Sequence, residues 1–252
     1  MDREKYLNRI NFSGELKLTL EVLKLLQKAH LLTVPFENLD IHYNRPIELN
    51  VEKIFEKIVL NNRGGFCYEL NGLFYKLLTS IGFNAKMISA RVFDKEKGYG
   101  QEFDHLTIIV DLDGAEYLAD VGFGEFAFAP LKLDLDTVQN DQRGDFVFDK
   151  YDEAYFRVNK IVDGQSTPEY IFKKKERQFA DYTGMCVYHQ TNPNSHFTQK
   201  RLISQATPKG RVTITDNLLK IKHEDSTTEL VLKEETDFKR ELWKHFKTKI
   251  EP

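Results

Sequence analysis

The sequence predicts an α+β protein in which helices come first along the chain and strands come later. Up to about residue 85, apolar residues recur at the spacing of one buried helix face, and from Lys86 the period shortens to that of strands. The helical and strand segments do not alternate, which argues against a parallel sheet built from βαβ units. A last amphipathic helix near the C-terminus completes the pattern.

Three helices are predicted in the N-terminal region. The first covers Leu16–Leu26, and the second covers Val51–Leu60 with Asn50 as its N-cap. The third begins near Cys67 and ends at Gly82, a residue type that adopts the left-handed conformation of many helix C-termini. Its buried face holds seven apolar residues at helical spacing: Phe66, Leu70, Leu73, Phe74, Leu77, Leu78 and Ile81.

Strands are predicted where β-branched and aromatic residues lie between turn signals. The central strands are Lys86–Val92, His105–Leu112, Glu116–Val121, Asp145–Phe148 and Tyr155–Val162. Two more strands, Arg211–Thr215 and Leu218–Ile221, precede the final helix. That helix, with Thr236 as its N-cap, is predicted to bury one stripe of apolar residues: Phe238, Leu242, Phe246 and Ile250.

The composition is that of a globular protein. Its 252 residues are 41% hydrophobic and 30% charged, which is too apolar for a disordered chain. A formal net charge of −3 gives no electrostatic reason to expect a nucleic acid or an anionic membrane as a partner. The seven histidines show no metal-ligand spacing, so no metal is expected.

Two further features predict a cytoplasmic protein. Cys67 and Cys186 are far apart and do not resemble a disulfide framework, which is typical of a reducing compartment. The N-terminus lacks an apolar signal core, and no stretch approaches the ~18 apolar residues of a membrane span.

Cys67 is the first candidate functional residue. It follows the pair Gly64-Gly65 and lies in the first turn of the third predicted helix. Unpaired N–H groups and the positive end of the helix dipole stabilise a thiolate there, so we expect a lowered thiol pKa and a nucleophile. The alternative is that Cys67 is a small buried hydrophobic residue, as most lone cysteines are.

A nucleophilic cysteine needs a base, and the base needs a partner that orients it. His105 begins one predicted strand, and Asp120 lies near the end of the next, across the hairpin turn Asp113-Gly114. If those two residues form the loop, Leu112 faces Ala115, and Asp120 becomes the diagonal neighbour of His105 on the same face. The hairpin therefore predicts a His–Asp couple, although both side chains could instead be structural.

Three stretches resemble the signature motifs of the arylamine N-acetyltransferase family, namely Val34–Leu39, Arg63–Asn71 and Asp120–Gly124. Tyr6–Ile10 and Asn192–Phe197 are also similar to the family. The resemblance implies a helical bundle over residues 1–85, a β-barrel over 86–190, and a linker with a C-terminal α/β lid over 191–252. It places the nucleophilic cysteine in the first domain and its histidine and aspartate in the second, as in a cysteine-protease-like Cys-His-Asp core.

The same resemblance implies an acyltransferase with Cys67, His105 and Asp120 as catalytic residues. It would carry an acetyl group from acetyl-CoA to an arylamine or hydrazine by a ping-pong mechanism through an acetyl-cysteine, as a monomer or weak homo-oligomer. Two other interpretations stay open. One is transglutaminase-like or cysteine-protease-like amide hydrolysis with the same triad, although the papain and caspase signatures are absent. The other is a binding module with an inert thiol.

Contacts to the substrates are predicted beside the family motifs. Phe36 and Phe123 are candidates for an apolar wall against an aryl ring, or else for ordinary core packing. Gly124 is the candidate cofactor contact, because the resemblance implies a glycine-rich loop around the CoA pyrophosphate. Here Glu125-Phe126 follow, an acidic and bulky pair that departs from the family pattern, so acetyl-CoA is expected to bind either weakly or by another route.

Two charged groups outside the triad also receive predictions. The resemblance suggests that Glu37 and Arg63 form a buried ion pair that positions the Gly64-Gly65 turn. The run Lys173–Lys175 is expected to be a solvated surface, with an alternative role near phosphate groups.

Overall fold

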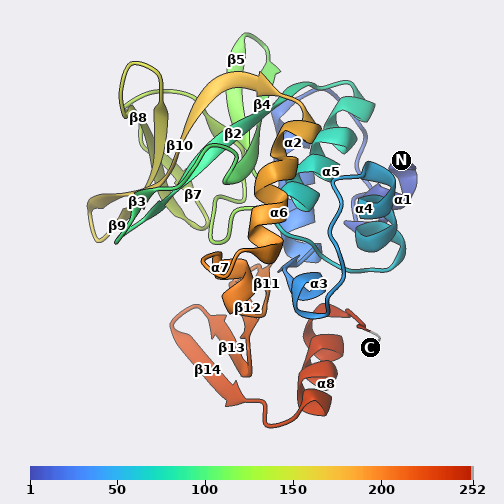
Figure 1. The fold of residues 1–252 in the computed structure, drawn as a ribbon. Coiled ribbons are helices and arrows are strands. Elements are labelled where there is room, and N and C mark those ends of the chain that lie inside the picture. The colour runs from blue at the N-terminus through green and yellow to red at the C-terminus, as the bar shows by residue number, and fades with distance from the viewer. Residues whose placement is uncertain (251–252) are drawn as a thin grey trace.

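The computed structural model describes residues 1–250. In Figure 1 the N-terminal helices lie beside a curved sheet, and a smaller sheet with its own helix lies below them. The helices that come first are α1 (Arg3–Arg9), α2 (Leu20–Thr33), α3 (Leu39–His42), α4 (Val51–Phe55) and α5 (Cys67–Ile81). The α+β order predicted from the sequence is confirmed.

The boundaries of these helices depend on their caps. The start predicted at Leu16 is wrong, because Thr19 caps α2 by accepting a hydrogen bond from the backbone N–H of Val22 at 3.3 Å. Asn50 caps α4 as predicted, and the chain continues past Phe55 as a π-helical turn, η1 (Glu56–Leu60). Gly82 ends α5 with φ 113°, which confirms the predicted left-handed stop.

The central strands form one antiparallel sheet that curls into a nearly closed barrel. Its strand order is β6-β5-β4-β2-β10-β9-β8-β7, and a short strand β3 (Gly98–Tyr99) pairs with β2. The eight strands are β2 (Asn84–Asp94), β4 (His105–Leu112), β5 (Ala115–Ala119), β6 (Leu131–Lys132), β7 (Gln139–Asp141), β8 (Gly144–Lys150), β9 (Phe156–Val162) and β10 (Gln165–Arg177).

Side chains close the barrel and fill it. The Gln139 side chain donates to the backbone C=O of Lys132 and accepts from its N–H, both at 2.8 Å, and so joins the edge strands β6 and β7. Alternate residues of β4 face opposite ways, with Ile108 packed against the helices and Ile109 against the barrel interior. The interior is filled mainly by large aromatic side chains: Phe126, Phe146, Phe148, Tyr170 and Phe172.

The C-terminal part adds a second sheet that includes a strand from the N-terminal region. After η2 (Phe179–Tyr182), α6 (Thr183–Thr191) and α7 (His196–Gln199), the strand order is β1-β11-β12-β13-β14. These strands are β1 (Phe36–Glu37), β11 (Leu202–Thr207), β12 (Gly210–Thr215), β13 (Leu218–His223) and β14 (Ser226–Val231). Because β1 precedes the barrel in sequence, the second sheet is joined directly to the helical region.

The final helix, α8 (Glu235–Phe246), packs on this sheet. Its N-cap is Glu234 and not Thr236 as predicted, since Asp237 accepts hydrogen bonds from the N–H groups of Lys233 and Glu234 just before the helix. The predicted stripe is buried as expected, and Ile250 belongs to it although it lies beyond the helix end. The last two residues of the expected third domain, 251–252, lie outside the described residues.

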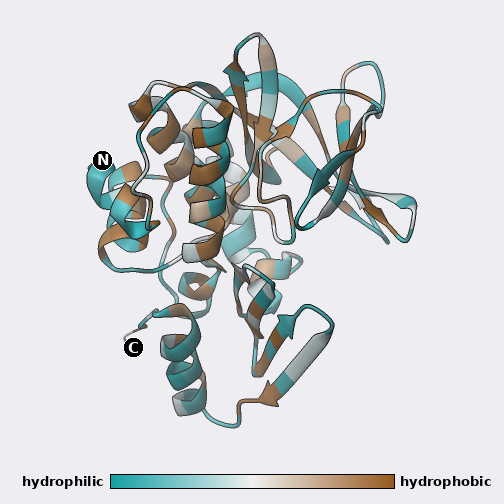
Figure 2. Ribbon diagram, turned by 180° about the vertical axis from the view of Figure 1, so that it is seen from behind, coloured by the Kyte–Doolittle hydropathy of each residue, from teal (hydrophilic) through white to brown (hydrophobic). Residues whose placement is uncertain are grey.

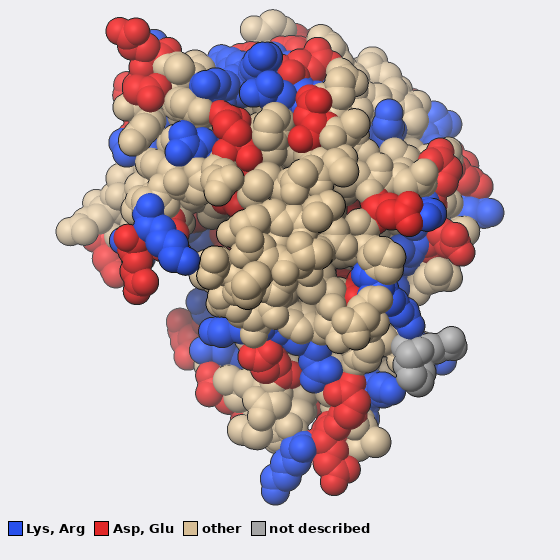
Figure 3. Space-filling view, in the orientation of Figure 1, with Lys and Arg blue, Asp and Glu red and all other residues tan. Residues whose placement is uncertain are grey.

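The surface is mixed in charge. Figure 2 shows hydrophobic residues concentrated on the helices that lie against the barrel. On the face in Figure 3, basic and acidic side chains are interspersed around an uncharged central area. No helix within residues 1–250 is long and apolar enough to cross a membrane.

Candidate active site

Cys67 is the first residue of α5, and the backbone that leads to it is tightly packed. A Cβ on Gly64 would lie 2.0 Å from the carbonyl oxygen of Pro35, so only glycine fits there. The N–H of Glu37 donates to the Gly65 carbonyl at 2.9 Å, which ties this turn to β1. The glycine pair therefore brings the start of α5 against the Val34–Leu39 motif.

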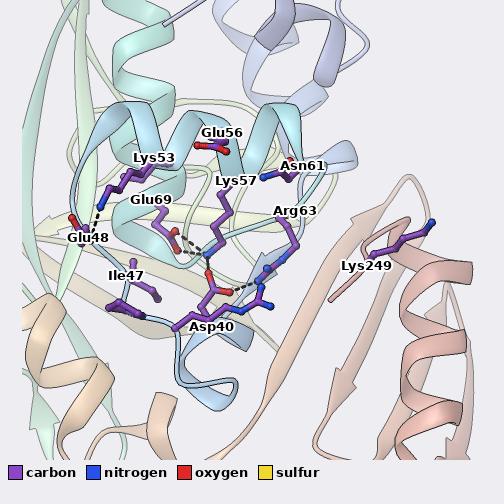
Figure 4. A pocket seen from close by; sticks show the side chains of 13 residues that line it. Asp40, Ile47, Glu48, Lys53, Glu56, Lys57, Asn61, Arg63, Glu69 and Lys249 are labelled. Carbon is purple, nitrogen blue, oxygen red and sulfur yellow. Dashed lines mark hydrogen bonds and ion pairs between the residues drawn. The ribbon is translucent and has the colours of Figure 1, made fainter. Parts of the chain in front are cut away.

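A buried cluster of charges lies under this turn, beside a cavity of about 500 Å³ (Figure 4). The Arg63 guanidinium is 2.7 Å from Glu37 and 2.8 Å from Asp40, which confirms the predicted Glu37–Arg63 pair. Lys57 bonds Asp40 at 2.7 Å and Glu69 at 2.8 Å from the other side. Burial works against the charges of Lys57 and Arg63, but the surrounding carboxylates raise both pKa values above their usual range.

Glu69 connects this cluster to the helix start, because its Oε2 accepts a hydrogen bond from the N–H of Phe66 at 3.1 Å. Burial raises the pKa of the Glu69 carboxyl, while Lys57 acts in the opposite direction. The position of Cys67 thus rests on a network that reaches from α3 to α5.

The β4–β5 hairpin has the predicted register, with Leu112 opposite Ala115 and Ile108 opposite Ala119. Asp120 follows directly after β5, and His105 is the first residue of β4. Their side chains meet, with His105 Nε2 2.7 Å from Asp120 Oδ2, and both residues are buried. The two-residue loop therefore produces the His–Asp couple.

The Asp120 carboxylate has no exposure to solvent but accepts hydrogen bonds from several elements. Asn71 of α5 donates to Oδ1 at 2.8 Å, the N–H of Gly122 donates to Oδ1 at 2.9 Å, and the Tyr170 hydroxyl of β10 donates to Oδ2 at 3.0 Å. Burial opposes ionisation, but attraction to His105 and the hydrogen bonds from His105, Asn71 and the Gly122 N–H hold the pKa of the Asp120 carboxyl below its usual value.

None of these three partners was predicted as a site residue, although Gly122 lies within the family motif Asp120–Gly124. Asn71 lies within the family motif Arg63–Asn71, so the motif itself was the signal that could have identified it. Tyr170 carries no such signal, because its contact with Asp120 arises only when β10 pairs with β2 across the barrel.

The environment of the Cys67 thiol differs from the expectation. Burial raises the pKa of Cys67 well above its ordinary value, Asp104 and Asp120 act in the same direction, and a hydrogen bond from the Leu106 backbone opposes them. The predicted lowering of this pKa by the helix N-terminus is therefore wrong for the isolated thiol, because burial removes the water that would solvate the charge. A thiolate at Cys67 needs a cation beside it.

Cys67 and His105 line the same pocket, which has a volume of about 380 Å³. The predicted substrate contacts Phe36 and Phe123 both line it, and the Phe123 ring lies 5.1 Å from the His105 ring. Gly124 also lines it, and its carbonyl accepts a hydrogen bond from Arg211 at 2.5 Å. Residues that were not predicted complete the lining: Val92, Asp104, Gly122, Glu125, His189, His196, Phe197, Leu202, Ser204 and Arg211.

The lysine run and the second cysteine, Cys186, lie outside this pocket. Lys174 of the lysine run bonds Glu116 at 2.5 Å, and none of Lys173–Lys175 lines the pocket. Cys186 is buried, and burial raises its pKa to about 12. Within residues 1–250, no group of three or more His, Cys, Asp or Glu side chains is placed to hold a metal ion.

Comparisons with known proteins agree with these features. The chain matches the family model described as N-acetyltransferase over residues 19–251. Human arylamine N-acetyltransferase 1 is 34% identical over 230 residues, which cover 83% of this chain and 79% of the human protein. The arylamine N-acetyltransferase of Escherichia coli (strain K12) is 33% identical over 214 residues, covering 84% and 75%.

Solved structures share the whole fold. The arylamine N-acetyltransferase from Salmonella typhimurium superposes with a TM-score of 0.93 at 26% identity, covering 99% of this chain and 92% of that one. The Mycobacterium marinum arylamine N-acetyltransferase in complex with CoA gives a TM-score of 0.89 at 28% identity, covering 98% and 92%. These matches confirm the predicted architecture of N-terminal helices, a nearly closed barrel and a C-terminal lid. The chain belongs to the arylamine N-acetyltransferase family, and it is an acyltransferase.

Proposed function

We propose that this protein transfers an acetyl group from acetyl-CoA to an arylamine or hydrazine through a thioester on Cys67. The observation that carries the proposal is the pocket in which Cys67 lies with His105, whose Nε2 is bound to the buried Asp120. A thiol, an imidazole and an orienting carboxylate in this order are the parts that nucleophilic catalysis by cysteine requires.

The high pKa of the isolated Cys67 thiol defines how the nucleophile forms. Because Asp120 occupies Nε2, the other ring nitrogen of His105, Nδ1, accepts the Cys67 proton. The resulting thiolate and imidazolium neutralise each other inside the pocket, and Asp120 stabilises the imidazolium. The charge is therefore created in the pair and not by loss of a proton to water.

In the first half-reaction the Cys67 thiolate attacks the acetyl carbonyl of acetyl-CoA. The bond between the acetyl carbon and the CoA sulfur breaks, and the CoA sulfur takes the proton held by His105. In the second half-reaction the amine nitrogen attacks the acetyl-cysteine, and His105 accepts the amine proton. The bond to Cys67 breaks, and the Cys67 sulfur takes that proton back as the amide leaves.

The pocket walls support an aromatic acceptor. Phe36, Phe123 and Phe197 present three rings near Cys67, with Phe36 and Phe197 6.0 Å apart between ring centroids. Stacked or edge-on contacts with an aryl ring suit such a surface. The names of the related proteins support an arylamine as acceptor, and the Mycobacterium marinum complex supports CoA as the donor's carrier.

Intact mass measurement tests the proposal. We expect the protein mixed with acetyl-CoA alone to gain one acetyl group on Cys67, and to lose it when an arylamine is added. Cys67→Ala should gain none. No adduct on the wild-type protein together with turnover of a peptide or glutamine amide would favour hydrolysis, and neither reaction would favour a binding module.

A further inference from the structure

The pocket of Cys67 contains a second carboxylate next to a second imidazole, those of Asp104 and His189. Asp104 directly precedes His105 at the start of β4, whereas His189 belongs to α6. The two side chains meet, with His189 Nε2 3.3 Å from Asp104 Oδ1. The proposed acetyl transfer assigns no role to either of them, although both line the pocket of the nucleophile.

The Asp104 carboxylate has free capacity for hydrogen bonds, in contrast to that of Asp120. Asp120 accepts from four donors. Within residues 1–250, the Asp104 carboxylate accepts only from the N–H of Val92, which is 3.3 Å from Oδ2, and no Lys or Arg side chain forms an ion pair with it. An ionised carboxylate has about four acceptor sites, and this side chain is 20% exposed. Asp104 therefore presents unused acceptor sites to a molecule in the pocket.

His189 is fixed behind Asp104 by other contacts. Its Nδ1 is 3.2 Å from the Ser195 hydroxyl oxygen, and its ring meets the Phe197 ring edge to face at 5.1 Å between centroids. The buried Nε2 has no hydrogen bond, because its contact with Asp104 has the distance of an ion pair without the alignment of a hydrogen bond. Such contacts in a free enzyme often tighten when the substrate binds. His189 thus limits where the Asp104 carboxylate can lie.

The negative charge of Asp104 opposes one half-reaction and suits the other. Burial raises the pKa of Cys67 most, and the Asp104 charge raises it further, by more than the Asp120 charge does. A charge with this effect lies near the sulfur, and hence near the acetyl group that the sulfur would carry. When an amine attacks that acetyl group, its nitrogen becomes positive as the new bond forms, and a nearby carboxylate stabilises this charge.

We propose that Asp104 is a catalytic residue of the second half-reaction, in which its carboxylate accepts a hydrogen bond from the attacking amine and stabilises the positive charge on the nitrogen. This inference rests on the proposed function, because it concerns the attack on acetyl-Cys67. His189 is a positioning residue that acts through Asp104.

The two N–H bonds of a primary amine then have separate partners. One proton goes to His105, and the other N–H donates to Asp104, which takes no proton. The bond between nitrogen and the acetyl carbon forms, the bond to the Cys67 sulfur breaks, and that sulfur receives the proton from His105. The orientation imposed by both partners directs the nitrogen lone pair at the acetyl carbon.

Separate measurement of the two half-reactions tests the proposal. p-Nitrophenyl acetate, a small uncharged donor, acetylates Cys67 without an amine, and stopped-flow detection of nitrophenolate gives that rate. Aniline added to the acetylated protein gives the rate of transfer. For Asp104→Asn we expect transfer to aniline to slow at least about tenfold, since a charged hydrogen bond is lost. Acetylation should be as fast as in the wild type or faster, and iodoacetamide should alkylate Cys67 faster, because a charge that opposes the thiolate is gone.

Asp134→Asn is the matched control. Asp134 is exposed and does not line the pocket, so the same change of charge should leave both rates unchanged. His189→Gln should slow transfer to aniline by less than Asp104→Asn does. In a protein that already carries Asp104→Asn it should have no further effect on transfer, and an independent loss there would contradict its role as a positioning residue.

The outcomes separate this proposal from the proposed function. Equal slowing of both half-reactions in Asp104→Asn would show that Asp104 only maintains the pocket, and unchanged transfer would show that the amine does not contact it. Either result, or the same slowing in Asp134→Asn, would overturn the role of Asp104 while acetylation of Cys67 left the proposed function intact. If Cys67 of the wild-type protein gained no acetyl group, the proposed function itself would fail.

Discussion

Asp120 is the residue on which the electrostatics of the candidate site depend. Its carboxylate is buried without solvent exposure, yet four donors from the helix α5, the strands β4 and β10 and its own loop converge on it. A buried carboxylate this well bonded stays ionised, so it can stabilise positive charge on His105.

Replacement of Asp120 tests that role. Asp120→Asn keeps the shape but loses the charge and alters the tautomer of His105, so the rate of Cys67 acetylation should fall by about 10³ or more. His105→Gln should cost at least as much. Stopped-flow measurement with p-nitrophenyl acetate gives both rates, and a variant that kept more than about a tenth of the wild-type rate would contradict the triad.

Tyr170→Phe removes one of the four donors without changing the charge. Loss of a hydrogen bond to a carboxylate should lower the rate by about tenfold. Because the hydroxyl favours the ionised form of Asp120, its removal raises the pKa of that carboxyl and should move the acidic limb of the pH–rate profile to higher pH. Tyr155→Phe is the control, since Tyr155 donates to Glu102 outside the pocket. An unshifted limb would show that Tyr170 only fills space.

At the scale of elements, the start of α5 is held by buried ion pairs, whereas pairs on the barrel surface are partly exposed. The Arg63 side chain is 6% exposed and pairs with two carboxylates, whereas the Arg157 side chain is 29% exposed and pairs with one carboxylate, that of Asp149. Burial determines how much each pair contributes to stability, because water screens the Arg157–Asp149 pair but not the pairs of Arg63.

We therefore expect Arg63→Ala to cost about 3–5 kcal/mol of unfolding free energy, because it removes one of the two cations that offset the buried carboxylates and leaves Lys57 alone to do so. Arg157→Ala, the matched exposed pair, should cost about 1 kcal/mol or less. Urea denaturation measures both. Equal losses would mean that the buried cluster beneath the Gly64-Gly65 turn contributes no more stability than an exposed pair. If the rate of Cys67 labelling were unchanged in Arg63→Ala, the cluster would stabilise the fold without positioning Cys67.

Glu169 on β10 is a partly buried acid that makes the stability of the folded protein depend on pH. Burial raises its pKa to about 7, with Lys160 opposing and Glu125 adding to the shift. The usual value is about 4.3, so the folded protein binds this proton more tightly than the unfolded chain does. Its contribution to stability is complete below about pH 4 and is lost as the pH rises toward 7.

Glu169→Gln removes that titration. The variant should melt at a higher temperature than the wild type at about pH 8 and at the same temperature near pH 4.5. Glu176→Gln, an exposed change on the same strand, should have no effect at either pH. A gain of the same size at both pH values would show that ionisation of Glu169 is not the cause.

At the scale of the whole molecule, the pocket exists only because three regions meet. Phe36 and Cys67 come from the N-terminal part, His105 and Phe123 from the barrel, and Phe197 from the segment before the second sheet. Asn38 joins the first region to the last, because its side chain bonds the carbonyls of Phe197 and Lys200 and the N–H of Leu202.

Asn38→Ala should therefore affect both stability and substrate binding. It leaves three backbone groups without their partner, at about 1–3 kcal/mol for each that stays buried, so a loss of at least about 3 kcal/mol is expected. Where the variant is still folded, KM for the arylamine should rise, because Phe197 loses its anchor. Asn140→Ala, an exposed asparagine on β7, is the control. An unchanged KM would show that other contacts hold Phe197.

The sequence by itself determined the local parts of the site. The start of α5 at Cys67, its end at Gly82 and the register that brings Asp120 to His105 all follow from spacing and turn chemistry over a few residues. The family motifs added the class of enzyme and the order of its domains. These features were predictable because their causes lie close together along the chain.

Only the tertiary structure decided what depends on burial and on contacts between distant segments. Tyr170 reaches Asp120 from fifty residues away, the Cys67 thiol is desolvated instead of acidified, and the pocket of Cys67 has walls from the helical region, the barrel and the second sheet. A pKa shift depends on burial together with the charges and hydrogen bonds that distant segments supply, and a cavity needs walls from more than one element. Neither the pKa of a buried group nor the shape of a cavity can be predicted from the spacing of residues along one segment.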